Sequence, residues 1–597
     1  MTTNLPVSEW RVLFFSPNAG LWQTSQLEHE LANGLALLGA HVTVIRCRGL
    51  FSSFCPTMQA SSTSPESPVE SKVRVCKSCQ QDESVLNSVA KYKTIWIDDF
   101  IASDTRSEVD ATMKSVTQEN WQDLYSHGIP IGVYSTYLSM LHHKVPDVTA
   151  STQAWGEFLS DTKNSLYAAH ALPIILEKIA PTHAVVYNPL YPTNRVFTEL
   201  IRQQENIQYV GLSASGFVPD RYSTIALYRS IESSQTAVDS KTLIESMSVP
   251  LSELEIAMVA RQLGQLVQGS DPWVYSTAPT YMPNAEIRKL LKLKGNSPVA
   301  VVLIGSPDET RSSALVGAEF ERVPIDQVST VQEFIEQTLR TAALLPRIDF
   351  IFRLHPRLAP NKRESLRSPD LDAIEQLLAN HPDNVTINAP ADGIGLYDVA
   401  RIASCGINHA SSAGLELLAL GIPVVHYDPP RINAYPSTLG FEVPRLDTDA
   451  FVQATQLAVN TPVSTETAVM AWRWYAVILL RAVTHKSWIT TAAHMQDPNQ
   501  NSTAQSFQWL RNLLPESFRE RVSRAQAQRK RNVQTIQIDN SLQPSPWIRE
   551  SAERISAFDN STIWNPKAFT RGEPLQEHQE QQKVTETIMK LRYSIDN

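Results

Sequence analysis

Short apolar runs alternate with longer amphipathic stretches from the N-terminus to about residue 220. The apolar run at Arg11–Ser16 predicts a buried strand, the stretch at Gln26–Leu38 predicts a helix, and the run at His41–Ile45 predicts the next strand. A strand, a helix and a strand in this order predict a βαβ unit with a parallel sheet. The same alternation predicts further strands at Thr94–Asp98, Ile129–Tyr134, His183–Tyr187 and Ile207–Leu212, and a long helix at Gln153–Ile179.

A second series of strands and helices follows a mixed, proline-containing segment at residues 212–297, which we expect to connect two domains. Pro298–Ile304 predicts a buried strand, Thr330–Leu344 a helix and Ile348–Leu354 another strand. The sequence therefore predicts an α/β fold with two Rossmann-like, doubly wound domains that face a cleft. We expect an N-terminal domain over residues 1–270 with a cysteine-containing insertion at 47–80, a C-terminal domain over 271–490, and a helical or irregular C-terminal extension over 491–597.

Two polar motifs follow predicted strands of the second domain. Arg353–Arg357 has the sequence Arg-Leu-His-Pro-Arg, and Asn408–Glu416 carries Ser411 and Ser412 at the start of a predicted helix. Parallel strands end at one edge of a sheet, and a helix N-terminus carries unpaired N–H groups and partial positive charge, so an anion would be bound there. Alternatively, the serines only cap the helix and Pro356 only ends the strand. Two such motifs in consecutive β/α units favour a binding site.

The same residues resemble the donor domain of GT-B glycosyltransferases. The likeness rests on His355-Pro356, on Ser-Ser-x-Gly-x-Glu at residues 411–416, and on Gly-Ile-Pro-Val-Val from Gly421. It is closest to the capsule polysaccharide biosynthesis group, which includes bacterial Kdo transferases and is similar in its motifs to bacterial sialyltransferases. The resemblance extends over residues 298–430, is looser over the first 220 residues and is absent at the C-terminal end.

The resemblance implies a nucleotide-sugar donor, commonly a CMP-sugar, whose phosphate is held by His355 and the serine pair. Arg353 or Arg357 would offset the phosphate charge as the leaving group departs. Glu416 would accept a hydrogen bond from a ribose hydroxyl, or it only favours the positive end of the helix. The candidate donor-binding residues are His355, Arg353, Arg357, Ser411, Ser412, Gly414, Glu416 and Ser306.

The acceptor side of the reaction depends on residues of the first domain. Inverting sugar transfer needs a general base, usually a carboxylate, near the acceptor hydroxyl. We expect this base among Asp99, Asp98 and Glu28, in that order, although each could be an ordinary solvated residue. Asn188 and Arg195 lie at another strand-to-helix edge and would contact the acceptor or brace that turn. No D-x-D pair stands in a nucleotide context, so we expect no cofactor to be required for catalysis.

Four of the five cysteines, Cys47, Cys55, Cys76 and Cys79, lie in one insertion between a strand and the next helix, which we expect to be rich in loops. Cys76-Lys-Ser-Cys79 has the two-residue spacing of a zinc knuckle, whereas seven residues separate Cys47 from Cys55, more than in a standard first pair. A cytosolic chain is not expected to carry structural disulfides. The alternatives are therefore a structural zinc site, a redox pair and ordinary buried thiols.

Composition excludes several classes of protein. The formal net charge of −9 and the isoelectric point near 5.9 argue against a nucleic-acid binder. The N-terminus lacks the features of a signal peptide, and no segment has the roughly 20 apolar residues that span a bilayer, so we expect a cytoplasmic protein. The loop at Gly20 lacks the G-x-G-x-x-G spacing of a dinucleotide site. The amphipathic stretch Phe507–Val522 and the basic Arg529–Arg531 would contact the inner membrane face peripherally or pack on the second domain.

Together these features predict a glycosyltransferase that moves a sugar from a nucleotide-sugar donor to a growing surface or capsular glycan. The acceptor would be a glycan or a lipid-linked glycan, and no nucleic acid would be a partner. The alternatives are a glycerophosphotransferase or a nucleotide-sugar epimerase with the same cleft, and a catalytically silent scaffold.

Overall fold

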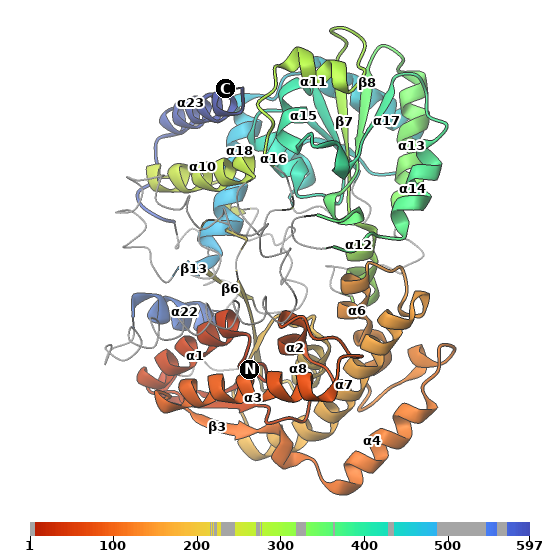
Figure 1. Cartoon of the computed structure of the whole chain (residues 1–597). Helices are drawn as coiled ribbons and strands as arrows, with labels where there is room; N and C mark the ends of the chain where they lie inside the picture. Colours follow the sequence, from red (N-terminus) through yellow and green to blue (C-terminus); the bar gives the residue numbers. More distant parts are fainter. Residues whose placement is uncertain are drawn as a thin grey trace.

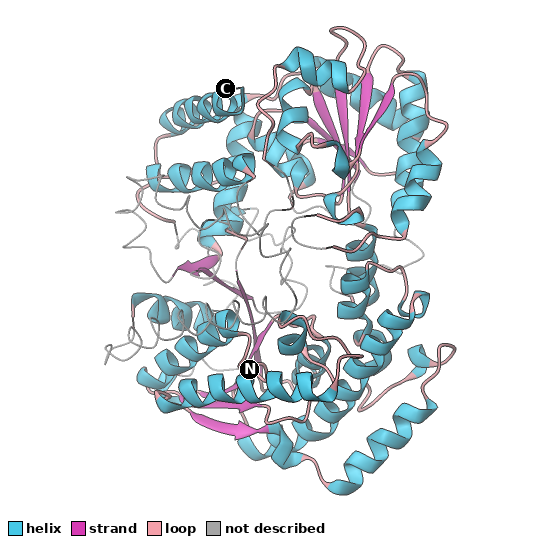
Figure 2. Cartoon of the chain, in the orientation of Figure 1, coloured by secondary structure: helices cyan, strands magenta, loops and turns pink. Residues whose placement is uncertain are grey.

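The computed structural model of this protein contains two β-sheets, each flanked by helices (Figure 1). Figure 2 shows the helices around the strands of each sheet. The structure describes residues 6–214, 216–217, 219, 224–228, 245–269, 275, 278–317, 330–361, 365–427, 435–485, 545–557 and 570–596. The segments Phe507–Val522 and Arg529–Arg531, expected to contact a membrane or the second domain, lie outside these residues.

The first sheet has the strand order β13-β6-β5-β4-β1-β2-β3. Strands β1 to β5 are parallel, and β6 and β13 add an antiparallel edge. Counted along the chain, the five parallel strands lie in the order 3-2-1-4-5, which is typical of a Rossmann-like domain. The strands are β1 Arg11–Phe15, β2 His41–Arg46, β3 Lys93–Trp96, β4 His183–Tyr187, β5 Gln208–Ala214, β6 Thr224–Tyr228 and β13 Val483–His485.

The second sheet has the order β12-β11-β10-β7-β8-β9, and its strands are parallel. This is the order 3-2-1-4-5-6 of a doubly wound sheet, so the α/β fold with two Rossmann-like domains is confirmed. All six residues of β7 are buried, as expected for a central strand with both faces covered. The strands are β7 Val299–Ile304, β8 Asp349–Arg353, β9 Val385–Asn388, β10 Cys405–His409, β11 Val424–Tyr427 and β12 Phe441–Val443.

Helices cover both faces of each sheet (Figure 1). Around the first sheet they are α1 Trp22–Leu37, α2 Pro56–Ala60, α3 Val69–Ser88, α4 Ser103–Ser115, α5 Ile131–Tyr134, α6 Thr136–His143, α7 Thr152–Ile179, α8 Pro192–Arg202 and α22 Pro546–Ala557. With the second sheet lie α10 Glu253–Gln268, α11 Asn284–Leu290, α12 Pro307–Leu315, α13 Val331–Leu344, α14 Asp370–Leu378, α15 Leu396–Ile402, α16 Ala413–Ala419, α17 Thr448–Asn460, α18 Thr465–Ala476 and α23 Glu577–Asp596. No helix of the described residues is long and apolar enough to cross a membrane.

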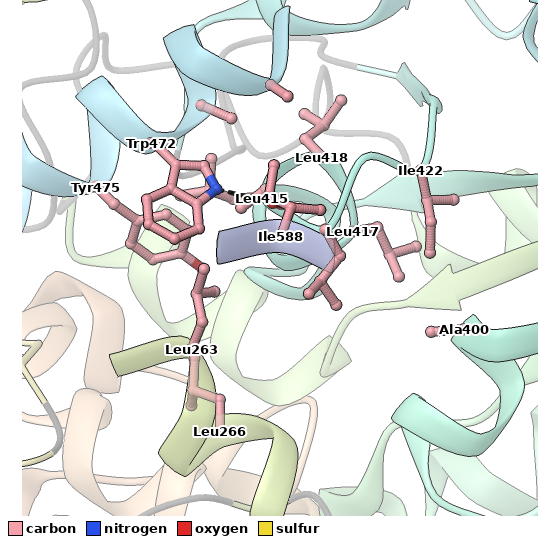
Figure 3. Packing of buried hydrophobic residues seen from close by; sticks show 14 of the residues in the cluster. Leu263, Leu266, Ala400, Leu415, Leu417, Leu418, Ile422, Trp472, Tyr475 and Ile588 are labelled. Atoms are coloured by element: carbon pink, nitrogen blue, oxygen red, sulfur yellow. Dashed lines mark hydrogen bonds between the residues drawn. The ribbon is translucent and has the colours of Figure 1, made fainter. Parts of the chain in front are cut away.

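One apolar core joins α10, α16, α18 and α23 on one face of the second sheet. In Figure 3, Trp472 and Tyr475 of α18 lie beside Leu415 and Leu418 of α16, with Ile588 of α23 close by. The buried indole of Trp472 donates to the carbonyl of Ala419 at 2.8 Å, which satisfies its only polar group. The C-terminal helix α23 is therefore part of the second domain's core.

The chain returns from the second domain to the first through α18. A single π-helical turn, Val477–Arg481, follows α18 and leads into β13, which pairs with β6 of the first sheet. The chain thus crosses back from the second domain to the first sheet at this point. Helix α22 then packs against α1, where Ile548 lies over Gly34. A Cβ at Gly34 would lie 2.5 Å from the Ile548 side chain, so this contact requires glycine.

Two predictions of local structure are wrong. The predicted strand Ile129–Tyr134 is the short helix α5, because Pro130 begins a helical turn and Gly132 packs against the carbonyl of Trp121. Short apolar runs do not distinguish a strand from a buried helix. The cysteine insertion is not mainly loop, since α3 is a 20-residue helix that carries Cys76 and Cys79.

The buried ion pair between Arg481 and Glu255 gives a stability prediction. Glu255→Ala would leave the guanidinium of Arg481 buried without its counter-charge, and we expect it to lower the free energy of unfolding by about 3–5 kcal/mol. Glu253→Ala, in the same turn of α10, removes an exposed pair with Lys583 and should cost less than about 1 kcal/mol. Urea denaturation followed by tryptophan fluorescence measures both, and equal losses would contradict the prediction.

Candidate functional site

A cavity of about 330 Å³ opens at the carboxyl edge of the second sheet. Its floor comes from the end of β7, the turn after β8 and the start of α16, and its far wall comes from α10 and the segment after α18. Strands β7 and β10 are neighbours, and the strand order reverses between them. Ligands of doubly wound sheets bind at such a switch point. The lining residues include Gly216, Gln262, Tyr275, Arg353, His355, Leu396, Ser411, Ser412, Glu416, Tyr475, Ile478 and Leu479.

His355 lines the cavity and begins a short 3₁₀ turn, Pro356–Leu358. Its Nδ1 accepts a hydrogen bond from the main-chain N–H of Arg357 at 3.2 Å. A neutral imidazole whose Nδ1 accepts carries its hydrogen on Nε2. The main chain therefore selects the tautomer in which Nε2 is the donor.

Ser411 and Ser412 line the same cavity from the turn between β10 and α16. Ala410 has a φ of +53°, which bends the chain sharply after the strand. The hydroxyl of Ser411 also accepts from the N–H of Ala413 at 3.3 Å, so part of the capping interpretation is correct. Helix α16 has only seven residues, so anion binding here would depend on side chains and local N–H groups more than on a helix dipole.

Gly414 lies behind the serines and not in the cavity wall. A Cβ at this position would lie 2.2 Å from the hydroxyl of Tyr435 and 2.7 Å from the amide of Asn408. The glycine is therefore needed for packing between α16 and its neighbours.

Arg353 lines the cavity, and its guanidinium is bound within the protein. It donates to the side chain of Asn388 and, at 3.0 Å, to the carbonyl of Ile394. Burial lowers the pKa of Arg353 to about 10, against the opposing effect of nearby carboxylates such as Asp398. The group stays charged at neutral pH and places a fixed positive charge beside the cavity.

Arg357 and Ser306 belong to a neighbouring network and do not line the cavity. The guanidinium of Arg357 pairs with Asp308 at 2.5 Å and donates to the hydroxyl of Tyr275 at 2.9 Å. The hydroxyl of Ser306 also donates to Asp308. Asp308 therefore engages two of the residues that the sequence predicts at a phosphate.

Glu416 lines the cavity from the first turn of α16. Its carboxyl accepts a 2.5 Å hydrogen bond from the hydroxyl of Tyr397. Burial raises the pKa of Glu416, and the Tyr397 hydrogen bond and the charge of Arg353 oppose that rise. A carboxylate held in this way can accept from a ligand hydroxyl.

The structure does not bring Asp98 or Asp99 to the cavity. They follow β3, the edge strand of the first sheet. Asp98 accepts main-chain N–H groups of Arg48 and Leu50, both at 2.8 Å, and Asp99 forms a half-exposed ion pair with Arg48 at 2.6 Å. Both carboxylates thus brace the loop after β2.

Glu28 is buried near the end of β1 and does not line the cavity. It accepts a 2.5 Å hydrogen bond from Ser16, whose hydroxyl in turn accepts from Arg46 at 2.6 Å. Burial raises the pKa of Glu28 to about 7, against the opposing effects of Arg46 and Ser16. A carboxyl with this pKa can exchange a proton near neutral pH.

Asn188 and Arg195 brace the turn after β4. Asn188 has a φ of +43°, and its side chain accepts from the N–H of Leu190 at 3.2 Å. Arg195 is buried, pairs with Glu199 at 3.0 Å and lies 4.4 Å from the centre of the Tyr134 ring. Neither residue lines the cavity.

Three cavity residues with polar side chains were not predicted from the sequence as site residues. Gln262 is a buried polar residue on the apolar face of α10. A polar residue at an apolar position of a helix can be recognised in the sequence as a candidate site residue. Tyr475 lies among the buried residues of α18, where nothing in the sequence marks it as a site residue. Tyr275 lies in the proline-containing connection, where no periodic pattern marks it.

The four clustered cysteines, Cys47, Cys55, Cys76 and Cys79, line one cavity of about 20 Å³, enough for one water-sized sphere. Main-chain N–H groups donate to two of the sulfurs, at 3.1 Å on Cys79 and 3.3 Å on Cys47. Burial raises the pKa of Cys55 to about 12 and of Cys79 to about 11. Among the described residues, no three His, Cys, Asp or Glu side chains are arranged to hold a metal. Zinc, with Zn–S near 2.3 Å, would need the sulfurs to approach one another, and it stays a prediction.

No family model and no curated protein matches this sequence. Similar solved structures include sucrose-phosphate synthase from Thermosynechococcus elongatus, at 14% identity, covering 78% of this chain and 94% of that chain, with a TM-score of 0.29. The calicheamicin glycosyltransferase CalG4 is 13% identical (79% and 94% covered, TM-score 0.25), and a UDP-GlcNAc 2-epimerase from Neisseria meningitidis is 11% identical (81% and 99%, TM-score 0.22).

The strand orders, the switch-point cavity and the crossing helix define the class directly. This is a two-domain α/β protein of the GT-B arrangement, with a ligand-sized cavity at the carboxyl edge of its second sheet.

The raised pKa of Glu28 gives a pH prediction. Between its ordinary value of 4.5 and about 7, the folded protein holds a proton that the unfolded chain releases, so this contribution to stability is lost as pH rises through that window. Glu28→Gln should therefore gain stability relative to wild type between about pH 5 and pH 8. Thermal unfolding across this range measures it, with Glu30→Gln on the same helix as control. A constant difference between Glu28→Gln and wild type at all pH values would contradict the prediction.

Metal analysis tests the cysteine cluster. If the cluster is a structural zinc site, plasma mass spectrometry of protein purified without chelators should find about one zinc per chain, because four thiolates satisfy a tetrahedral ion. Cys79→Ser should release the metal, whereas Cys405→Ala, at the lone cysteine in β10, should retain it. Wild-type protein without bound metal would exclude zinc and leave a redox pair or ordinary buried thiols as the alternatives.

Proposed function

We propose that this protein is a cytoplasmic glycosyltransferase that transfers a sugar from a nucleotide-sugar donor to a surface or capsular glycan. The observation that supports this most is the convergence of His355, Ser411, Ser412 and Glu416 on one cavity at the switch point of the second sheet. The two sequence motifs that suggest a donor site are fifty residues apart, and their side chains lie around the same space.

The donor phosphate would lie between His355 and the serine pair. Nε2 of His355 and the serine hydroxyls would donate to its oxygens, and the buried charge of Arg353 would stabilise the negative charge that develops on the leaving phosphate. Glu416 would accept a hydrogen bond from a ribose hydroxyl.

A donor with one phosphate, such as a CMP-sugar, fits the charges around this cavity better than a diphosphate donor. Arg357, which the sequence suggests as a second phosphate ligand, is paired with Asp308. Among the described lining residues, Arg353 is the remaining arginine. Fixed positive charge is the main means of binding additional phosphate groups, so its scarcity in the described part of the wall favours a single phosphate.

The acceptor would approach from the first domain. None of the three candidate bases lines the cavity. Of these we retain Glu28, because its pKa near 7 suits a group that accepts a proton from a hydroxyl at neutral pH, and this role requires the acceptor to reach its buried carboxyl. Asp98 and Asp99 instead hold the loop after β2. Catalysis by this scheme requires no metal ion.

Nucleotide binding tests the donor site. We expect CMP to raise the melting temperature of the wild-type protein and His355→Ala to abolish the shift, because a ligand that binds only the native state stabilises it. His381→Ala, an exposed histidine of the same domain, is the control and should keep the shift. CDP, UDP and GDP identify the donor class in the same screen.

Product analysis then separates the alternatives. A transferred sugar would support the proposal. A transferred glycerol phosphate would instead identify a glycerophosphotransferase, and an epimerised nucleotide sugar would identify an epimerase. Absence of stabilisation by all four nucleotides would favour a catalytically silent scaffold.

A further inference from the structure

Helix α6 of the first domain ends against the turn that carries His355. Lys144 follows this helix with a φ of +53° and is 1% exposed. Its ammonium donates to two carbonyl oxygens of the second domain, those of Arg357 and Leu366, each at 2.6 Å. A buried ammonium needs such acceptors, because leaving it without them in a dry interface is costly.

A second hydrogen bond between the domains has its donor in the second domain and its acceptor in the first. The guanidinium of Arg357 donates to the carbonyl of Leu141, in the last turn of α6, at 3.0 Å. The same guanidinium is held by Asp308 at 2.5 Å, from helix α12. Helices α6 and α12 lie side by side where the two domains meet (Figure 1). We call the reciprocal contacts of Lys144 and Arg357 the interdomain clasp.

The clasp reaches His355 through one residue. The N–H of Arg357 donates to Nδ1 of His355, and the carbonyl of Arg357 accepts from Lys144. The main chain of Arg357 is therefore held at two points: His355 binds its N–H group, and Lys144 of the first domain binds its carbonyl group. If the second contact is lost, the 3₁₀ turn at Pro356–Leu358 loses a constraint, and the orientation of the His355 ring is less strictly set.

We propose that Lys144 is a positioning residue for the nucleotide site, through which the first domain holds the His355 turn in its phosphate-binding conformation. This inference rests on the proposed function. Under it, Arg357 is an interdomain contact and not a phosphate ligand. Donor binding by the second domain then depends on a lysine of the first domain that does not line the cavity.

The test compares Lys144→Met with Lys163→Met in the full chain. Methionine keeps the length of the lysine side chain and removes its donors and its charge. We expect Lys144→Met to weaken CMP binding about tenfold by calorimetry, a change that corresponds to about 1.4 kcal/mol. Lys163 forms a half-exposed pair with Asp110 on the first domain, and its replacement should change the dissociation constant less than about twofold.

A double-mutant cycle separates positioning from general stabilisation. If Lys144 acts through His355, Lys144→Met should have no further effect on nucleotide affinity in the His355→Ala background, where weak residual binding is measured at high nucleotide concentration. Equal losses of affinity in both backgrounds would overturn the proposal. An unchanged affinity in Lys144→Met alone, even with a lower melting temperature, would also overturn it.

Hydrogen exchange tests the clasp without nucleotide. We expect faster exchange in Lys144→Met for peptides covering residues 354–361, and unchanged exchange there would contradict the clasp. This readout stays informative if wild-type protein binds none of the nucleotides, an outcome that would remove the proposed function. Asp308→Asn, which weakens the hold on Arg357 at nearly constant volume, provides a second variant if Lys144→Met does not fold, and it should change exchange and affinity in the same direction.

Discussion

The buried ion pair between Arg481 and Glu255 sets the geometry on which the cavity depends. Arg481 donates to both carboxylate oxygens at 2.8 Å and to three main-chain carbonyls of residues 246–250. Its position fixes where the chain turns from α18 toward the first sheet, and Glu255 fixes the start of α10. Because Ile478 and Gln262 lie on these same two elements, the ion pair holds together the two parts of the far wall of the cavity.

The arginine side chains near the carboxyl edge of the second sheet are bound by other groups of the protein itself. Arg353 is held by an amide and a carbonyl, and Arg357 by a carboxylate and a carbonyl of the other domain. Arginines in such networks cannot reorient without leaving buried partners unsatisfied. The positive charge beside the cavity is therefore fixed in advance, which is the condition for electrostatic stabilisation without reorganisation.

Periodicity predicts the α/β order well, because strands with both faces buried and amphipathic helices leave local patterns. The opening βαβ unit and the long helix α7 follow their predicted bounds within a few residues. The cavity histidine and serines were also identified, since strand ends carry a short motif. Lys144 left no such signal, because its partners are more than two hundred residues away. The pairing of Arg357 with Asp308 was missed because the two residues are 49 positions apart and no local pattern connects them.

The first domain is built from both ends of the chain. Strand β13 pairs with β6, and Ile548 of α22 fills the space over Gly34. During synthesis, the residues up to 228 leave the ribosome long before these segments exist. Until they arrive, β6 lacks this partner and the apolar surface over α1 is open to water. The N-terminal domain therefore reaches its final form only after most of the second domain has been made, which reverses the usual order of domain completion.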